Sequence, residues 1–212
     1  MKKIIISFLF LLLLSTVKAQ TLIIPIESKT ERGIPGAYYK DTYNNLNQFV
    51  GIWKYENTTT NTILEIHLFK KTMNYNNIYY EDTLYGEYVY IENGVTKINT
   101  LPNLSTILEN VNKHKVHDGN FFLVNENSPK CNDCYLGQKR VQLILIDPVK
   151  KVGHIITLRV NNTNPLTMRL HNTSDGLTYP SDANINTIEG LLSGVKVGVT
   201  IPLGWYDLVK QP

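Results

Sequence analysis

The chain has 212 residues, with 21 Lys and Arg against 18 Asp and Glu, and only two cysteines. That length suits one domain with a sizeable hydrophobic core. The excess of positive charge comes entirely from Lys2, Lys3 and Lys18, so the rest of the chain carries 18 charges of each sign. Without a net positive field the composition argues against a partner that is nucleic acid or an anionic membrane.

Residues 1–19 have the three parts of a secretory signal peptide. Two lysines near the start precede an apolar run of 11 residues at 4–14, and Val17-Lys18-Ala19 comes before an expected cut ahead of Gln20. The alternative is an uncleaved membrane anchor, but a spanning helix needs roughly 20 apolar residues. We therefore expect a secreted or periplasmic protein with no membrane span after cleavage.

Residues 20–45 mix proline, glycine and charge, which predicts an extended lead-in before a single domain at 46–212. In that domain, short runs rich in Val, Ile, Thr, Tyr and Phe are divided by turn-forming residues. The runs predict strands at 49–56, 62–70, 83–92, 95–101, 119–125, 139–146, 152–161, 165–171, 195–201 and 204–209. Short helices are expected at 104–111 and 182–194. The pattern indicates an all-β fold, either a closed barrel or a sandwich.

Two hairpins are marked by their turns. Asn93-Gly94 lies between two apolar-bearing runs and is the dipeptide that a type I′ turn favours. Asp147-Pro148 divides two further runs, and proline there pre-sets φ for a tight turn.

The first predicted strand carries a glycine two residues before a tryptophan. Alternation places Phe49, Gly51, Trp53 and Tyr55 on one face of 49–56. A glycine on the inner face leaves room for a close neighbour and lets the strand bend. The tryptophan would then lie across the floor of a barrel, although an ordinary core aromatic beside an incidental glycine gives the same pattern.

This Gly-x-Trp, just after a turn-rich segment, resembles the lipocalin (calycin) pattern. The resemblance implies an antiparallel up-and-down β-barrel of about 8–10 strands with a ligand cavity. It also implies that a basic side chain covers the tryptophan, a role that Lys210 or Arg169 would take. The second lipocalin motif, a turn of the Thr-Asp-Tyr type, is absent from the chain.

A longer resemblance covers residues 38–101. "YYKDTYNNLNQFVGIWKYEN", "YYEDTLYGEYVYIENG" and the "KAQ" end of the signal peptide resemble an uncharacterised family of small secreted Bacteroidota proteins. The resemblance implies a lineage and a compartment. It supplies no activity and no functional residues.

The two cysteines, Cys131 and Cys134, form a single Cys-x-x-Cys in a stretch that reads as a loop. One such pair gives two ligands, whereas a structural zinc site needs four. A redox pair is usually found at a helix N-terminus. For an exported chain a local disulfide is favoured, with free thiols and a metal or redox role as the alternatives.

Motifs for catalysis and metal binding are missing. His114 and His117 have the spacing of two ligands on a helix, but their segment reads as a loop and no further ligands are evident. Gly-x-Ser-x-Gly, His-Glu-x-x-His, phosphate loops and dinucleotide fingerprints do not occur. We predict no catalytic residues, no metal and no cofactor, and lean against an enzyme.

Two binding functions remain. The first is a non-catalytic, lipocalin-like protein for a small apolar or amphipathic ligand. Its cavity candidates are Trp53, Tyr55, Leu64, Ile66, Leu68, Tyr88, Tyr90, Leu143, Leu145, Ile156, Leu158, Met168 and Leu170, unless these side chains fill the barrel. The second is a surface module that binds protein or glycan through the tyrosine-rich segment 79–90. An enclosed apolar void would favour the first, and a filled barrel with an exposed aromatic patch the second.

Overall fold

The computed structural model describes residues 21–28, 33–105, 111–123, 131, 133–135, 137–161, 163, 166–173, 177–178, 195–196 and 198–212. The expected signal peptide at 1–19 and the expected helix at 182–194 lie outside these residues. No helix in this part of the chain is long and apolar enough to cross a membrane.

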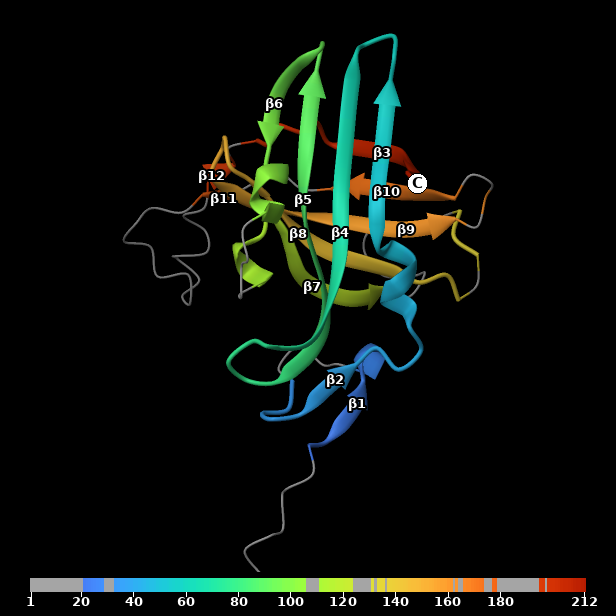
Figure 1. Cartoon of the computed structure of the whole chain (residues 1–212), viewed down its shortest axis with the longest axis vertical. Coiled ribbons are helices and arrows are strands. Elements are labelled where there is room, and N and C mark those ends of the chain that lie inside the picture. The colour runs from blue at the N-terminus through green and yellow to red at the C-terminus, as the bar shows by residue number, and fades with distance from the viewer. Residues whose placement is uncertain are drawn as a thin grey trace, which may run out of the picture.

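Eight antiparallel strands close into a barrel. They are β3 (Gly51–Asn57), β4 (Thr62–Tyr75), β5 (Tyr80–Glu92), β7 (Val116–Leu123), β8 (Arg140–Asp147), β9 (Val152–Asn161), β10 (Thr167–Asn172) and β13 (Gly204–Lys210). Neighbours in the barrel follow chain order; β5 pairs with β7, and β13 returns to β3. The structure confirms the all-β, up-and-down, lipocalin-like fold expected from the sequence. In Figure 1, β3, β4 and β5 run steeply across β8, β9 and β10.

Three segments share the edge of β5 that faces away from β4. The parallel strand β2 (Tyr38–Lys40) pairs at one end, β7 pairs in the middle through only two residues, and β6 (Val95–Asn99) pairs at the other end. β1 (Ile23–Pro25) adds to β2. The lead-in of the chain therefore extends the sheet with two short parallel strands.

The remaining elements are short. They are the 3₁₀ turns η1 (Ile26–Ser28), η2 (Asn45–Phe49), η3 (Leu101–Ser105) and η4 (Val111–Lys113), and a two-stranded ribbon of β11 (Leu177–Thr178) and β12 (Val195–Lys196). The helix expected at 104–111 meets 3₁₀ turns at its two ends, and residues 106–110 lie outside the described part. The strand expected at 195–201 is much shorter, because only its first two residues pair.

Both predicted hairpin turns are present. Asn93 and Gly94 have φ of 52° and 73°, as a type I′ turn requires. The carboxylate of Asp147 accepts hydrogen bonds from the backbone N–H groups of Val149 and Lys150, both at 2.9 Å. These local bonds hold the β8–β9 turn in shape.

Trp53 closes the end of the barrel where β3 begins. Its side chain is fully buried, and the indole N–H donates a hydrogen bond of 2.8 Å to the carbonyl of Phe49 in η2. The Lys210 ammonium lies 5.4 Å from the centre of the indole ring. Trp53 thus has the floor position and the basic cover that the lipocalin resemblance implied. Lys210 supplies the cover, the first of the two residues considered for it.

Gly51 is needed at its position for two reasons. Its φ is +132°, a backbone conformation that side chains rarely adopt. A Cβ atom there would also lie 2.9 Å from Cε of Lys210. The glycine therefore bends the strand and makes room for the lysine that covers Trp53.

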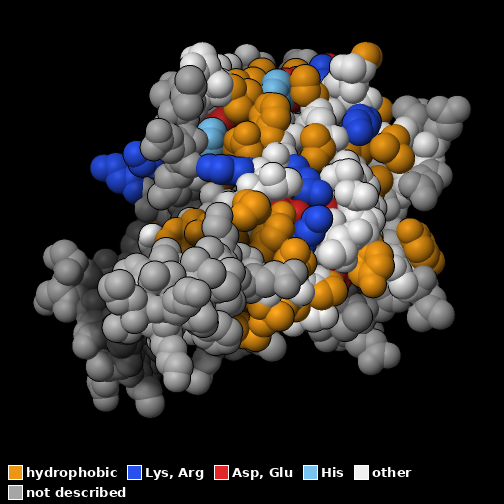
Figure 2. Space-filling view, turned by 60° about the horizontal axis from the view of Figure 1, so that its bottom comes forward, with side chains coloured by type: hydrophobic (Ala, Val, Ile, Leu, Met, Phe, Trp, Pro, Cys, Tyr) orange, Lys and Arg blue, Asp and Glu red, His pale blue; other side chains and the backbone are white. Residues whose placement is uncertain are grey.

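The surface mixes apolar and polar groups. Figure 2 shows hydrophobic side chains interleaved with lysine, arginine and histidine side chains on the face that it presents. Single exposed apolar residues are normal, so only those held in a defined arrangement suggest a function.

Candidate functional site

The predicted cavity residues lie in the barrel core. All except Tyr55 expose 1% of their surface or less, and they belong to one packed cluster. Tyr55 is partly buried and packs edge-to-face on Tyr206, with the ring centres 5.2 Å apart. Water has almost no access to these side chains, whereas a side chain that lines a ligand cavity usually leaves surface for water to touch.

The tyrosine-rich segment 79–90 is mostly buried too. Tyr79, Tyr88 and Tyr90 expose 7%, 0% and 1% of their surface, and Tyr80 and Tyr85 are partly buried. The three buried tyrosines belong to the hydrophobic core. The segment is therefore not the exposed tyrosine face considered from the sequence.

An exposed aromatic pair lies on the outside of β10 and β13. Trp205 exposes 51% of its surface, as expected from the charge in its strand. It stands directly opposite His171 in the β10–β13 register, and the two rings stack with 3.6 Å between centres and 10° between planes. One face of this exposed indole is therefore supported by a neighbouring ring.

A network of ion pairs adjoins the indole. Arg169 donates to Asp207 through Nε (2.6 Å) and Nη2 (3.0 Å), and through Nη1 to Asp133 (2.9 Å). The guanidinium carbon lies 5.8 Å from the centre of the Trp205 ring. Bidentate pairing of this kind fixes the planes of both partners. Arg169 is thus held beside the tryptophan of β13.

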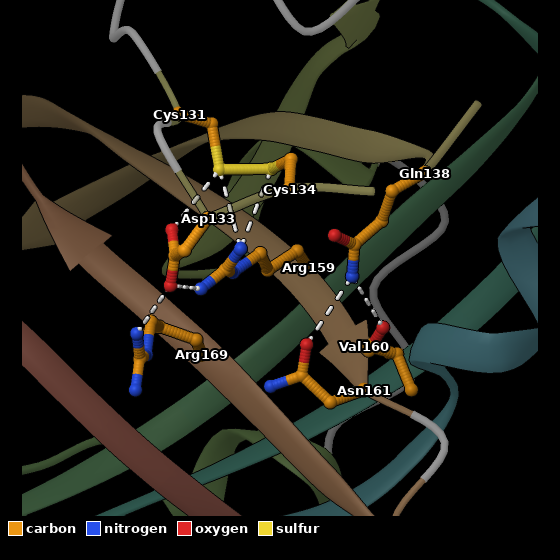
Figure 3. Close-up of a disulfide and its surroundings, with 8 residues drawn as sticks. All are labelled: Cys131, Asp133, Cys134, Gln138, Arg159, Val160, Asn161 and Arg169. Atoms are coloured by element: carbon orange, nitrogen blue, oxygen red, sulfur yellow. Dashed lines mark hydrogen bonds and ion pairs between the residues drawn. A yellow bond between two sulfur atoms is a disulfide. The ribbon is translucent and has the colours of Figure 1, made fainter. Parts of the chain in front are cut away.

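A disulfide anchors the loop that brings Asp133 to this network (Figure 3). Cys131 and Cys134 are joined, with 5.5 Å between their Cα atoms, which is the first of the three states considered for the pair. Arg159, 4% exposed, pairs with Asp133, and its Nη1 lies 3.2 Å and 3.4 Å from the two sulfur atoms. Asp133 of this loop therefore contacts both Arg159 in β9 and Arg169 in β10.

Strand register explains why these side chains meet. Leu158, Leu170 and Leu208 point into the core, so their sequence neighbours point outward. Two rows then cross the outside of the barrel. The first row is Trp205, His171, Thr157 and Gln142, and the second is Asp207, Arg169, Arg159 and Arg140. We call the outward side chains of Arg159, Arg169, His171, Trp205 and Asp207, with Asp133, the Trp205 face.

The charges of the Trp205 face compensate each other. The hydrogen bond from Arg159 lowers the pKa of Asp133, and the hydrogen bond to Asp207 raises the pKa of Arg169. Burial lowers the pKa of His171, so this ring is neutral at pH 7. Two carboxylates therefore balance the guanidinium groups of Arg159 and Arg169, while the third guanidinium of the row, that of Arg140, is buried at 2% exposure.

Several buried polar atoms beneath the Trp205 face have no hydrogen-bond partner among the described residues. Besides Nε of Arg159 they include Nδ1 of His171 and the hydroxyl of Thr157, which stand opposite each other in the β9–β10 register. Thr157 exposes only 4% of its surface. A buried polar atom without a hydrogen bond costs free energy. These atoms could therefore still form a hydrogen bond with a polar group.

The histidines considered as metal ligands both lie beside Tyr85. His114 lies 3.0 Å from Glu87 through Nδ1, and its ring packs on Tyr85. His117 is paired with Tyr85 across the β5–β7 seam. The described residues hold no group of three or more His, Cys, Asp or Glu placed to bind a metal.

Comparison with known proteins gives a family and no activity. No curated protein matches the chain. No solved structure matches it either. A family model for a family of unknown function (DUF6705) matches residues 1–211, nearly the whole chain. The chain with this barrel and this Trp205 face belongs to the DUF6705 family.

Proposed function

We propose that this protein is an exported, non-catalytic binding protein that contacts its partner through the Trp205 face. The observation that carries the proposal is the state of Trp205, which is half exposed and yet held by a stacked ring and a neighbouring guanidinium. Tryptophan and arginine are the residues that most often dominate binding surfaces.

Preorganisation is the physical argument for this choice. Binding costs free energy for every side chain that must be immobilised, about 0.5–1.5 kcal/mol for a flexible one. Trp205 and Arg169 are already fixed by His171, Asp207 and Asp133. They can therefore contact a partner with little further loss of conformational entropy.

The barrel itself supports a scaffold role. Eight strands enclose an interior just wide enough for side chains to fill or for one small ligand. The exposures of 1% or less among the predicted cavity residues favour filling. A packed barrel gives the outer residues rigid positions, which suits a surface binding module.

A second candidate function, the binding of a small apolar or amphipathic ligand inside the barrel, is favoured by His154. This side chain is 3% exposed and points inward, and its Nε2 has no partner among the described residues. Asn172 donates to the carbonyls of Ile201 and Pro202, so its oxygen must accept from Nδ1 of His154, at 2.8 Å. Burial lowers the pKa of His154, so the neutral ring leaves Nε2 as an acceptor. A ligand with a hydroxyl head group would donate a hydrogen bond to this nitrogen.

Native mass spectrometry of protein purified from its host would reveal such a ligand as added mass.

The proposed function is tested by sedimentation with an envelope fraction of the organism that produces the protein. We expect Trp205→Ala to reduce the bound fraction at least tenfold. Tyr75→Ala is the matched control, because Tyr75 is 53% exposed and its ring also contacts a ring across its hairpin, that of Tyr80. Equal retention of wild type and Trp205→Ala would overturn the proposal.

A further inference from the structure

Accepting the proposed function, we infer that the Trp205 face binds a neutral carbohydrate. The inference concerns the chemical class of the partner. It follows from which groups of the face are already paired, which remain open, and how far apart they lie.

The paired charges disfavour an anionic partner. Six hydrogen-bonding contacts within the protein join Arg169 and Arg159 to carboxylates or to the disulfide. A phosphate group would have to displace Asp207 or Asp133 to gain a bidentate contact with Arg169. Nucleic acids and anionic lipids need unpaired positive charge, which the face does not offer.

The carboxylates of Asp207 and Asp133 can still accept hydrogen bonds from hydroxyl groups. The side chains of Asp207 and Asp133 are each 58% exposed. A carboxylate has about four acceptor sites, and Arg169 occupies only one on each oxygen of Asp207. Neighbouring hydroxyls on a sugar ring are donors that suit these open sites. Arg169 holds the carboxylate plane in a fixed direction.

The spacing matches a sugar ring. Trp205 and Asp207 are two residues apart on β13, so their side chains leave the strand about 6.6 Å from each other. A pyranose ring on the indole would present its C–H groups to the negative face of the aromatic system. Its hydroxyls would then extend toward Asp207. The apolar and polar parts of the face thus correspond to the apolar and polar parts of one sugar.

The small aromatic area of the Trp205 face also favours a sugar over a protein as the partner. A stable protein partner buries about 800 Å² on each side, with several apolar anchors at its centre. On the Trp205 face the only exposed large aromatic is Trp205, and the other exposed groups are ion-paired. A protein partner is therefore the alternative outcome that the test must identify.

Affinity electrophoresis tests the inference. Each gel contains one neutral carbohydrate: an uncharged cellulose derivative, xylan, mannan, starch or an uncharged chitin derivative. We expect at least one of these neutral carbohydrates to retard wild type, with retardation that persists in 1 M salt. Trp205→Ala should lose at least tenfold in affinity, and Trp205→Phe should lose less because a ring remains. Asp207→Asn should weaken binding, and Tyr75→Ala should bind like wild type. Thermal unfolding of each variant verifies that it is folded.

Two results would overturn the inference. One is retardation by none of the carbohydrates, and the other is retardation only by heparin or DNA with loss in 1 M salt. If the carbohydrates fail while envelope binding still requires Trp205 and is destroyed by protease, the partner is a protein and the proposed function stands. If envelope binding is also indifferent to Trp205, both the inference and the proposed function are wrong.

Discussion

The two tryptophans of this chain have opposite environments. Trp53 is fully buried, donates to Phe49 and is covered by Lys210. Trp205 is half exposed and stacked on His171. The first is placed where it stabilises the fold, and the second where it can meet another molecule.

Truncating the two tryptophans should separate these roles. We expect Trp53→Ala to lower the free energy of unfolding by about 3–5 kcal/mol, because it leaves a cavity at a packed site. Trp205→Ala should cost about 1 kcal/mol or less, since its side chain has little surface to lose from the core. Urea denaturation of both variants measures this. A Trp53→Ala curve that overlays wild type would contradict the floor role.

Gly51 offers a second residue-scale prediction. Gly51→Val should lower the free energy of unfolding by roughly 1–3 kcal/mol, through backbone strain at φ +132° and crowding of Lys210. Lys210→Ala removes Cε, the atom that the new Cβ would crowd, and relieves none of the backbone strain. If the double variant regains wild-type stability, crowding alone explains the effect and the argument from φ is wrong.

Two histidines make stability depend on pH. Burial lowers the pKa of His154 and His171 in the folded protein, so the unfolded chain takes up protons first as pH falls. The free energy of unfolding should be at its full value above about pH 6.5 and decrease as the pH falls from there toward the folded-state pKa values. Urea titrations at pH 7.5 and 5.5 should show a smaller decrease for His154→Gln than for wild type. Equal decreases would remove His154 from the explanation.

At the scale of elements, the disulfide loop is a positioning device. It closes a ring of only a few residues, so it removes little entropy from the unfolded chain. Replacing both Cys131 and Cys134 by Ser should cost about 1 kcal/mol or less of stability. Binding to the envelope fraction should weaken more than stability does, because Asp133 is then no longer held against Arg159 and Arg169. A large loss of stability with unchanged binding would show a structural role instead.

Alternation in the sequence was sufficient to predict most barrel strands. β3, β4, β8, β9 and β13 alternate apolar and polar residues, and all five are found near their expected positions. β1 and β2 were missed because three-residue strands have almost no period of their own. β2 forms because β5, some 40 residues away in the chain, offers it an edge, and β1 then pairs with β2.

The Trp205 face could not be predicted in the same way. Its rows depend on register between β9, β10 and β13, and register is fixed by the packing of the opposite faces. The sequence indicated that Trp205 is exposed, but not that His171 lies against it. The tyrosine-rich segment 79–90 could not be placed from composition either, because Tyr79, Tyr88 and Tyr90 belong to the core.

At the scale of the whole molecule, the barrel combines a closed end, a packed interior and a rigid outer face. The closed end is built from η2, Trp53 and Lys210. The outer face is built on β9, β10 and β13, on the strands that cross behind β3, β4 and β5 in Figure 1. The part of the molecule that stabilises the fold is thus separate from the part proposed to bind.

The two indole N–H signals in an NMR spectrum test this separation most directly. Trp53 and Trp205 are the only tryptophans, and Trp205→Phe assigns the signals. On titration with the envelope fraction, or with a carbohydrate that retards the protein, we predict that the Trp205 signal shifts or broadens while that of Trp53 stays in place. A shift of the Trp53 signal with Trp205 unchanged would place the ligand inside the barrel and contradict binding at the Trp205 face.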